Sequence, residues 1–155
     1  MLVNSAYRGE SSRIGWTTEA DLLGGQRTDA DEIADLIGTE GSMILLCFGG
    51  SELIGSVHLQ RAPDGVWLGM FSVRPALQGR GVGKRFLAAA ERRAREEWGA
   101  GNAYMTVITR RRELIAWYER RGYRCAGRFK DFPNDPRFGI PRVAGLRLEV
   151  LEKCF

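Results

Sequence analysis

The segment FSVRPALQGRGVGK, from Phe71 to Lys84, joins an apolar run to a bend at Pro75, then to closely spaced glycines and a long amphipathic stretch. This order predicts a strand, a turn and a helix. The glycines let the backbone of the turn come close to a ligand. The first N–H groups of the helix then point at that ligand, with the positive end of the helix dipole behind them. The segment therefore predicts an anion-binding turn that suits phosphate groups.

Two common phosphate-binding motifs do not fit this turn. A Walker A loop, G-x-x-x-x-G-K-[S/T], needs a wider spacing than Gly79 and Gly83 provide, and Arg85 stands where it needs a hydroxyl side chain. A dinucleotide-binding fingerprint needs a glycine at Lys84 and an acid at the end of the next strand, where Ile108 and Thr109 stand instead. Neither a P-loop nor a Rossmann site is indicated.

The pattern that remains is Gln78-x-x-Gly81-x-Gly83, preceded by Val73-x-Pro75. It resembles the Q/R-x-x-G-x-G/A motif of the GNAT acetyltransferase family. The resemblance runs from about Leu53 to Tyr123 and includes WYERRGY, similar to the family's aromatic-Tyr-x-x-x-Gly-aromatic signature. A tightly packed strand-to-helix turn without a ligand is the alternative explanation of the glycines.

The resemblance implies a GNAT fold: a mixed α/β (α+β) architecture with a twisted, mostly antiparallel sheet flanked by helices. It also implies acetyl-CoA as co-substrate, with its pyrophosphate on the backbone amides of the turn and its pantetheine arm paired with the preceding strand. The implied cofactor-binding residues are Phe71, Ser72, Val73, Gln78, Gly79, Arg80, Gly81, Val82, Gly83 and Lys84.

Acyl transfer from a thioester to an amine needs a neutral amine, a stabilised oxyanion and a proton for the leaving thiolate. The resemblance makes Tyr118 the general acid, because a phenol with an ordinary pKa of about 10 keeps its proton at neutral pH. A core tyrosine one turn from Leu114 is the alternative. A backbone N–H near Val73 is implied as the oxyanion donor. We expect direct transfer of an acetyl group to a primary amine of an unidentified acceptor, a small molecule or a peptide; small amines, amino acids, peptide N-termini and lysine side chains all remain open.

The general base is not evident from the sequence. Residues 66–73 contain no Asp or Glu, where many relatives have a carboxylate, so deprotonation through water is expected. His58, the one histidine, could be a base or relay, or have no role. Glu19 and Asp21, beside Trp16, could attract a cationic amine or form a solvated helix face.

Arg110, Arg111 and Arg112 form a basic run before the helix that carries Tyr118. Arg111 stands where many relatives have an asparagine that contacts the cofactor, so the resemblance fails at this position. The arginines could reach a CoA phosphate or a substrate carboxylate, or simply be solvated at a helix start.

Periodicity predicts the order helix, helix, three strands, helix, strand, helix and two strands. The helices are expected near 19–23, 29–37, 82–98 and 113–121, and the strands near 42–48, 53–59, 66–73, 103–108, 123–129 and 143–151, with a loop over 130–142. Residues 1–8 read as the end of the family's first helix. The family's opening strand is therefore expected to be missing, and the exposed sheet edge would favour a homodimer.

The chain of 155 residues, 44% of them hydrophobic, suits one domain over residues 1–155. Its net charge of +4 is concentrated between Lys84 and Arg95 and in the run Arg110–Arg112, which suits a small anionic partner. Three scattered cysteines and one histidine give no metal-ligand pattern and suit a reducing cytoplasm. With no long apolar run and no signal peptide, a membrane partner is not expected.

Two other functions fit the same sequence. A GNAT-like fold can bind acyl-CoA as a sensor without turnover, because fold does not fix function. A basic nucleic-acid-binding module is the weaker alternative, because Glu91, Glu96 and Glu97 interrupt the basic helix and no RNA-binding signature is present. The cations of that face are Lys84, Arg85, Arg92, Arg93 and Arg95.

Overall fold

The apolar runs of the sequence form the strands of a six-stranded sheet in a computed structural model that describes residues 2–155. The strand order is β2-β3-β4-β5-β8-β6, and every neighbouring pair is antiparallel except β4 and β5. A separate pair of two-residue strands, β1 and β7, lies beside the sheet. The strands are β1 (Leu23–Gly24), β2 (Ser42–Gly49), β3 (Glu52–Ala62), β4 (Gly65–Val73), β5 (Asn102–Ile108), β6 (Arg124–Asp131), β7 (Ile140–Pro141) and β8 (Arg147–Cys154).

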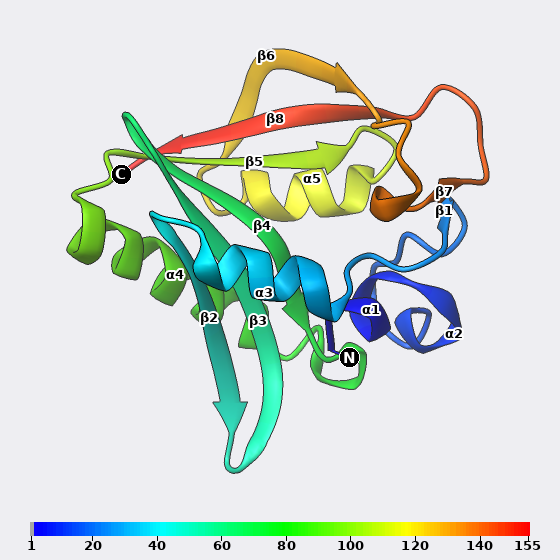
Figure 1. The fold of residues 1–155 in the computed structure, drawn as a ribbon, viewed down its shortest axis with the longest axis horizontal. Coiled ribbons are helices and arrows are strands. Elements are labelled where there is room, and N and C mark those ends of the chain that lie inside the picture. Colours follow the sequence, from blue (N-terminus) through cyan, green and yellow to red (C-terminus); the bar gives the residue numbers. More distant parts are fainter. Residues whose placement is uncertain (1) are drawn as a thin grey trace.

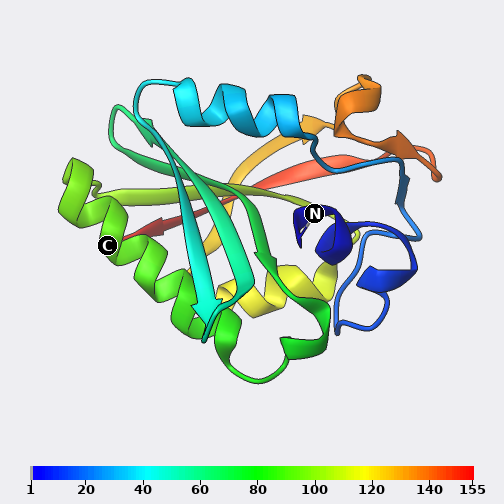
Figure 2. The same cartoon turned by 60° about the horizontal axis from the view of Figure 1, so that its bottom comes forward.

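Helices cover both faces of the sheet, with α3 on one side and α4 and α5 on the other (Figure 2). The apolar stripe of α4 is buried in the main core, where Phe86, Leu87 and Ala90 pack with the inward side chains of the central strands. Asp29 begins α3 by accepting a hydrogen bond from the Glu32 N–H at 2.8 Å. The helices are α1 (Leu2–Tyr7), α2 (Gly9–Ser12), α3 (Ala30–Gly38), α4 (Val82–Trp98) and α5 (Arg112–Glu119), with 3-10 turns at Pro75–Leu77 and Pro136–Phe138.

Strands β4 and β5 pair only at their beginnings and then diverge (Figure 1). Their parallel register covers Gly65–Trp67 against Asn102–Tyr104. The register between β3 and β4 shifts after Ser56, and Met70 has a φ of 48°, which marks a β-bulge in β4. The bulge bends β4 away from β5, so the edge of β4 beyond Trp67 is not paired with β5.

The structure confirms the α/β (α+β) fold class and the elements expected between 29 and 129, with ends shifted by a few residues. Leu2–Tyr7 is helical as expected. Met1, part of that expected helix end, lies outside the described residues. No helix in residues 2–155 is long and apolar enough to cross a membrane.

The helix expected over 19–23 is wrong, because local hydrogen bonds fold this segment into a turn. The Ala20 N–H donates to the Thr18 hydroxyl at 3.0 Å, and the Leu22 and Leu23 N–H groups both donate to the Glu19 carbonyl. The chain then pairs Leu23 with Pro141. The last strand begins at Arg147, not 143, and residues 130–142 contain the end of β6, a 3-10 turn and β7 where a plain loop was expected.

Candidate active site

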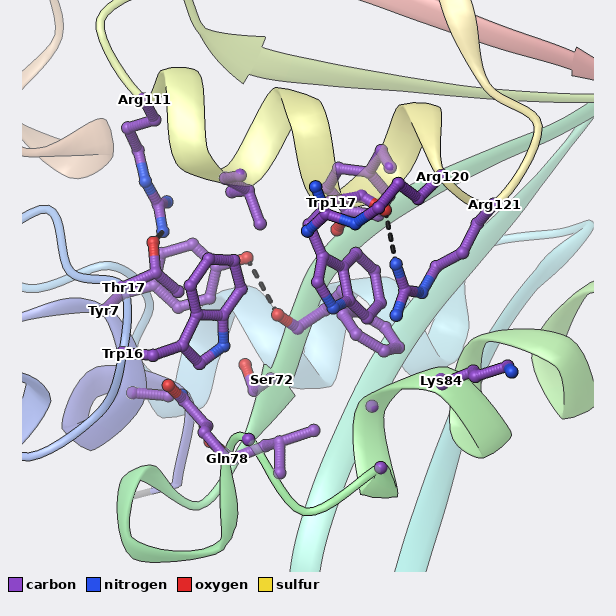
Figure 3. A pocket seen from close by; sticks show the side chains of 18 residues that line it. Tyr7, Trp16, Thr17, Ser72, Gln78, Lys84, Arg111, Trp117, Arg120 and Arg121 are labelled. Atoms are coloured by element: carbon purple, nitrogen blue, oxygen red, sulfur yellow. Dashed lines mark hydrogen bonds between the residues drawn. The ribbon is translucent and has the colours of Figure 1, made fainter.

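A cavity of about 430 Å³, the turn cavity, runs from the glycine-rich turn along the end of β4 to α5 (Figure 3). It brings together Tyr118 and eight of the ten residues predicted to bind the cofactor; Arg80 and Val82 do not line it. It also takes in residues from the N-terminal segment. Its lining comprises Ala6, Tyr7, Trp16, Thr17, Phe71, Ser72, Val73, Gln78, Gly79, Gly81, Gly83, Lys84, Arg111, Leu114, Trp117, Tyr118, Arg120 and Arg121.

The glycine-rich turn presents backbone donors to this cavity. Gly81 precedes α4 with a φ of 80°, a left-handed conformation that side chains rarely adopt. The first backbone hydrogen bond of the helix runs from Arg85 N–H to Gly81 O, and no side chain in residues 2–155 caps this end. The N–H groups of Val82, Gly83 and Lys84 are therefore left without helical acceptors.

Gln78 ties the turn to the end of β4. Its Nε2 donates to the Val73 carbonyl at 3.0 Å. Gly15 packs so closely on the Gln78 amide that a side chain at that position would displace it. The motif glutamine therefore fixes the position of the turn relative to the strand.

The two ends of the turn cavity differ in chemistry. In Figure 3, Lys84 and Arg121 lie at one end, and Arg111, Thr17 and Tyr7 at the other. Arg121 lies over the Trp117 ring at 3.5 Å from its centroid, so that the guanidinium is held beside the cavity. One end is thus suited to phosphate groups, and the other leads toward the opening between β4 and β5.

A second cavity of about 200 Å³, the splay cavity, lies between the diverging parts of β4 and β5. Most of its wall is apolar, with residues of both strands and of the loop at 132–138. Five residues line both cavities: Tyr7, Phe71, Arg111, Leu114 and Tyr118. The two cavities therefore meet beside Phe71 and Tyr118.

Tyr118 is 5% exposed and packs edge-on against the Trp117 and Tyr123 rings. Burial raises the pKa of its hydroxyl, so the group is protonated at neutral pH. Tyr7, which sequence reasoning missed, donates from its hydroxyl to the Phe71 carbonyl at 3.1 Å. No spacing in the sequence relates Tyr7 to β4, because the contact depends on how α1 packs.

Glu19 lies buried between two arginines, so the interpretation of a solvated helix face is wrong. Its carboxylate accepts hydrogen bonds from Arg8 Nη1 and, at 2.8 Å, from Arg111 Nη1. Arg8, Glu19 and Arg111 are 6%, 7% and 7% exposed. Asp21 is engaged by Arg13 at 2.6 Å, so neither predicted acid presents a free negative charge to a cationic amine.

The basic run before α5 is not simply solvated either. Arg111 Nη2 donates to the Thr17 hydroxyl at 2.7 Å, and this bond and the Glu19 pair join the start of α5 to the N-terminal segment. Arg110 instead donates to the Ala144 carbonyl on the surface. Arg8, like Tyr7, was missed, because only the folded chain brings it next to Arg111.

His58 lines neither cavity. Its Nε2 lies 2.9 Å from the Ser42 hydroxyl on the neighbouring strand, and burial lowers the pKa of the imidazole. Among residues 2–155, no group of three or more His, Cys, Asp or Glu side chains is arranged to hold a metal ion.

Comparison with known proteins agrees with this geometry. The sequence model of the acetyltransferase (GNAT) family matches residues 12–123. A search of curated proteins finds no match. The chain belongs to the acetyltransferase (GNAT) family, as the resemblance predicted.

Solved structures share the fold at low sequence identity. An IAA acetyltransferase from Bacillus cereus is 20% identical, with 82% of this chain and 85% of that chain covered and a TM-score of 0.67. The ribosomal-protein-S18-alanine N-acetyltransferase from Escherichia coli is 17% identical, with 83% and 81% covered and a TM-score of 0.65. A GNAT family acetyltransferase from Elizabethkingia anophelis with acetyl-CoA bound is 12% identical, with 82% and 84% covered and a TM-score of 0.65.

Proposed function

We propose that the protein is an acetyl-CoA-dependent N-acetyltransferase that acts on a primary amine in the cytoplasm. The observation that carries this proposal is the meeting of two cavities beside Tyr118, one ending on the glycine-rich turn and the other opening between β4 and β5. Such a pair of cavities suits a reaction that joins two substrates. The three cysteines are free, which is compatible with a reducing compartment.

Acetyl-CoA fits the turn cavity. Its pyrophosphate would accept hydrogen bonds from the N–H groups of Val82, Gly83 and Lys84, with the dipole of α4 behind them. Its pantetheine arm would lie along the edge of β4 at Phe71–Val73, which is not paired with β5. The bound acetyl-CoA in the Elizabethkingia anophelis relative supports this assignment.

The acetyl group would pass directly to the acceptor. The amine nitrogen attacks the thioester carbonyl carbon, a C–N bond forms, and the C–S bond breaks with its electron pair going to sulfur. The Tyr118 hydroxyl, which burial keeps protonated, gives its proton to that sulfur. A backbone N–H near Val73 would stabilise the oxyanion.

Deprotonation of the amine would go through water. The only carboxylate that lines either cavity within residues 2–155 is that of Glu19, which two arginines already engage. The proton lost by the amine would then pass to solvent, and Tyr118 would regain a proton from solvent, so a neutral amine and acetyl-CoA give an amide and CoA thiol with no net release of protons.

The basic face of α4 gives weaker support to the nucleic-acid alternative than the two cavities give to acetyl transfer. Arg92 and Arg93 lie 3.7 Å and 2.6 Å from the carboxylates of Glu96 and Glu97, so part of the positive charge is compensated. Glu91, however, is buried, accepting from the Tyr123 hydroxyl and Lys153, so it does not interrupt this face.

Calorimetry and a thiol-release assay test the proposed function together. We expect acetyl-CoA to bind with micromolar affinity and to release CoA thiol when an amine acceptor is added. Binding without thiol release from any amine would favour an acyl-CoA sensor. Failure to bind acetyl-CoA or any other acyl-CoA, combined with oligonucleotide binding that weakens steeply with salt, would replace the proposal with nucleic-acid recognition.

A further inference from the structure

The splay cavity has an unbalanced set of charges. Three arginines line it, Arg8, Arg27 and Arg111, against the single carboxylate of Glu19. Arg8 and Arg111 share that carboxylate. Arg27 makes no ion pair with any residue from 2 to 155; its guanidinium lies over the Tyr7 ring at 5.7 Å. The cavity therefore presents positive charge without an equal number of acids.

Each of these arginines also has a buried N–H group without a hydrogen-bond acceptor among residues 2–155: Arg8 Nε, Arg27 Nη1 and Arg111 Nε. Arg111 Nε lies 3.8 Å from the Glu113 carboxylate, too far for a hydrogen bond. The two terminal nitrogens of Arg8 donate to Glu19 and the Phe138 carbonyl, and those of Arg111 donate to Glu19 and Thr17. A buried donor without an acceptor is costly, so these groups add to the excess of arginines in a cavity that suits an anionic ligand.

Arg27 is held where it can meet such a ligand. Its backbone N–H donates to the Asn4 side chain at 2.8 Å, and the Asn4 amide donates to the Thr28 carbonyl at 2.8 Å. These bonds fix the segment that carries Arg27 to α1. The backbone at Arg27 is thus anchored, and the Nη1 group of its guanidinium has no acceptor among residues 2–155.

The remaining wall limits the rest of the ligand. Leu68, Met105 and Phe132 are among the apolar residues that line the cavity, and its volume of about 200 Å³ is below the range typical of sites for drug-sized molecules. A small molecule with an apolar body and one anionic group suits this combination. A carboxylate has two oxygens, which can accept hydrogen bonds from two separate guanidinium groups.

We propose that the acceptor is a small apolar amino acid, with its carboxylate on Arg8 and Arg27 and its amine beside Tyr118, where the two cavities meet. This inference rests on the proposed function, because it assigns the second substrate of the same reaction. It makes Arg27 a specificity-determining residue. It also replaces the expectation of a cationic acceptor, since Glu19 and Asp21 are both paired with arginines.

The experiment compares amino acids with their amides. Thiol release is measured with leucine, methionine and phenylalanine and with leucinamide, methioninamide and phenylalaninamide, which keep the amine and the side chain but lack the carboxylate. We expect KM for the amides to exceed KM for the acids about tenfold or more. Because amidation also lowers the basicity of the amine, KM is expressed as the concentration of neutral amine.

Arg27→Gln tests the assigned residue, since within residues 2–155 Arg27 has no ion-pair partner that the substitution would leave unpaired. We expect it to raise KM for the acids about tenfold or more and to leave KM for the amides unchanged. Arg13→Gln is the matched control, because Arg13 pairs with Glu10 and Asp21 and lines neither cavity. A merely structural loss at Arg27 would affect acids and amides alike.

Calorimetry of the same amino acids with CoA-saturated protein provides a second readout that does not depend on turnover. The inference is overturned if the acids and amides bind and react equally, if Arg27→Gln leaves their ratio unchanged, or if no amino acid binds. Preferential acetylation of phosphoethanolamine would mean that the anionic group of the acceptor is a phosphate, and would overturn the assignment of an amino acid. In each of these cases acetyl-CoA binding still supports the proposed function, whereas its absence would contradict that function itself.

Discussion

The turn cavity and the splay cavity meet at the same tyrosine but would recognise their proposed ligands by different means. In the turn cavity the donors are backbone N–H groups from one continuous segment, Gly81 to Lys84. In the splay cavity they are guanidinium groups of Arg8, Arg27 and Arg111, which only the fold brings together. Backbone donors persist whatever side chains surround them, whereas a guanidinium disappears with one substitution. The first cavity should thus be fixed in its ligand and the second adaptable.

Gly81→Glu should have the largest effect, because it places a carboxylate where the proposed function places the pyrophosphate. We expect acetyl-CoA affinity to fall at least about a hundredfold, through charge repulsion and loss of close backbone approach. Calorimetric titration with acetyl-CoA measures the loss.

Gly99→Glu is the matched control at the other end of the same helix. Gly99 also has a left-handed backbone, with a φ of 61°, and a side chain there would meet no atom within 4 Å. Both variants should therefore carry a similar backbone cost of about 1 kcal/mol. Equal loss of acetyl-CoA binding in both would mean that general destabilisation, not the turn, is responsible.

Tyr118→Phe should affect turnover and leave both cavities able to bind. We expect kcat to fall about a hundredfold, since a positioned general acid contributes that order of rate. Acetyl-CoA binding should be unchanged. Tyr104→Phe serves as control, because Tyr104 bonds Asp64 at 2.7 Å and lines neither cavity. An unaltered kcat in Tyr118→Phe would leave Tyr118 as a packing residue at the junction.

Glu19→Gln tests the side-chain construction of the splay cavity. It leaves Arg8 and Arg111 buried without their shared counter-charge, which should cost about 3 kcal/mol of unfolding free energy, measured by urea denaturation. Asp21→Asn removes a carboxylate from an exposed pair with Arg13 and should leave the urea midpoint unchanged. If the two variants behave alike, the buried cluster is no more important than a surface pair.

The same contrast explains what the sequence could predict. The glycine-rich turn and β4 were readable because their spacing along one segment reflects their geometry, and periodicity gave the helices α3, α4 and α5. Tyr118 was named from the family resemblance. The cluster of Arg8, Glu19 and Arg111 was not readable, since its members come from separate parts of the chain. The helix expected at 19–23 failed because the Thr18 hydroxyl and the Glu19 carbonyl closed a turn first.

His58→Gln should have the smallest effect and asks whether chemistry outside both cavities contributes. We expect kcat/KM within about twofold of wild type, because His58 lines neither cavity.

Burial lowers the pKa of His58 from 6.5, so the folded protein holds its imidazole neutral while the unfolded chain takes up a proton more readily. Its contribution to stability is therefore complete above pH 6.5 and falls as the pH drops below that value. Urea denaturation at pH 7.5 and 5.5 should show a smaller loss of stability in the variant. A fall in kcat/KM of about tenfold or more would instead make His58 the missing base or relay, and the account of a reaction confined to the two cavities would be wrong.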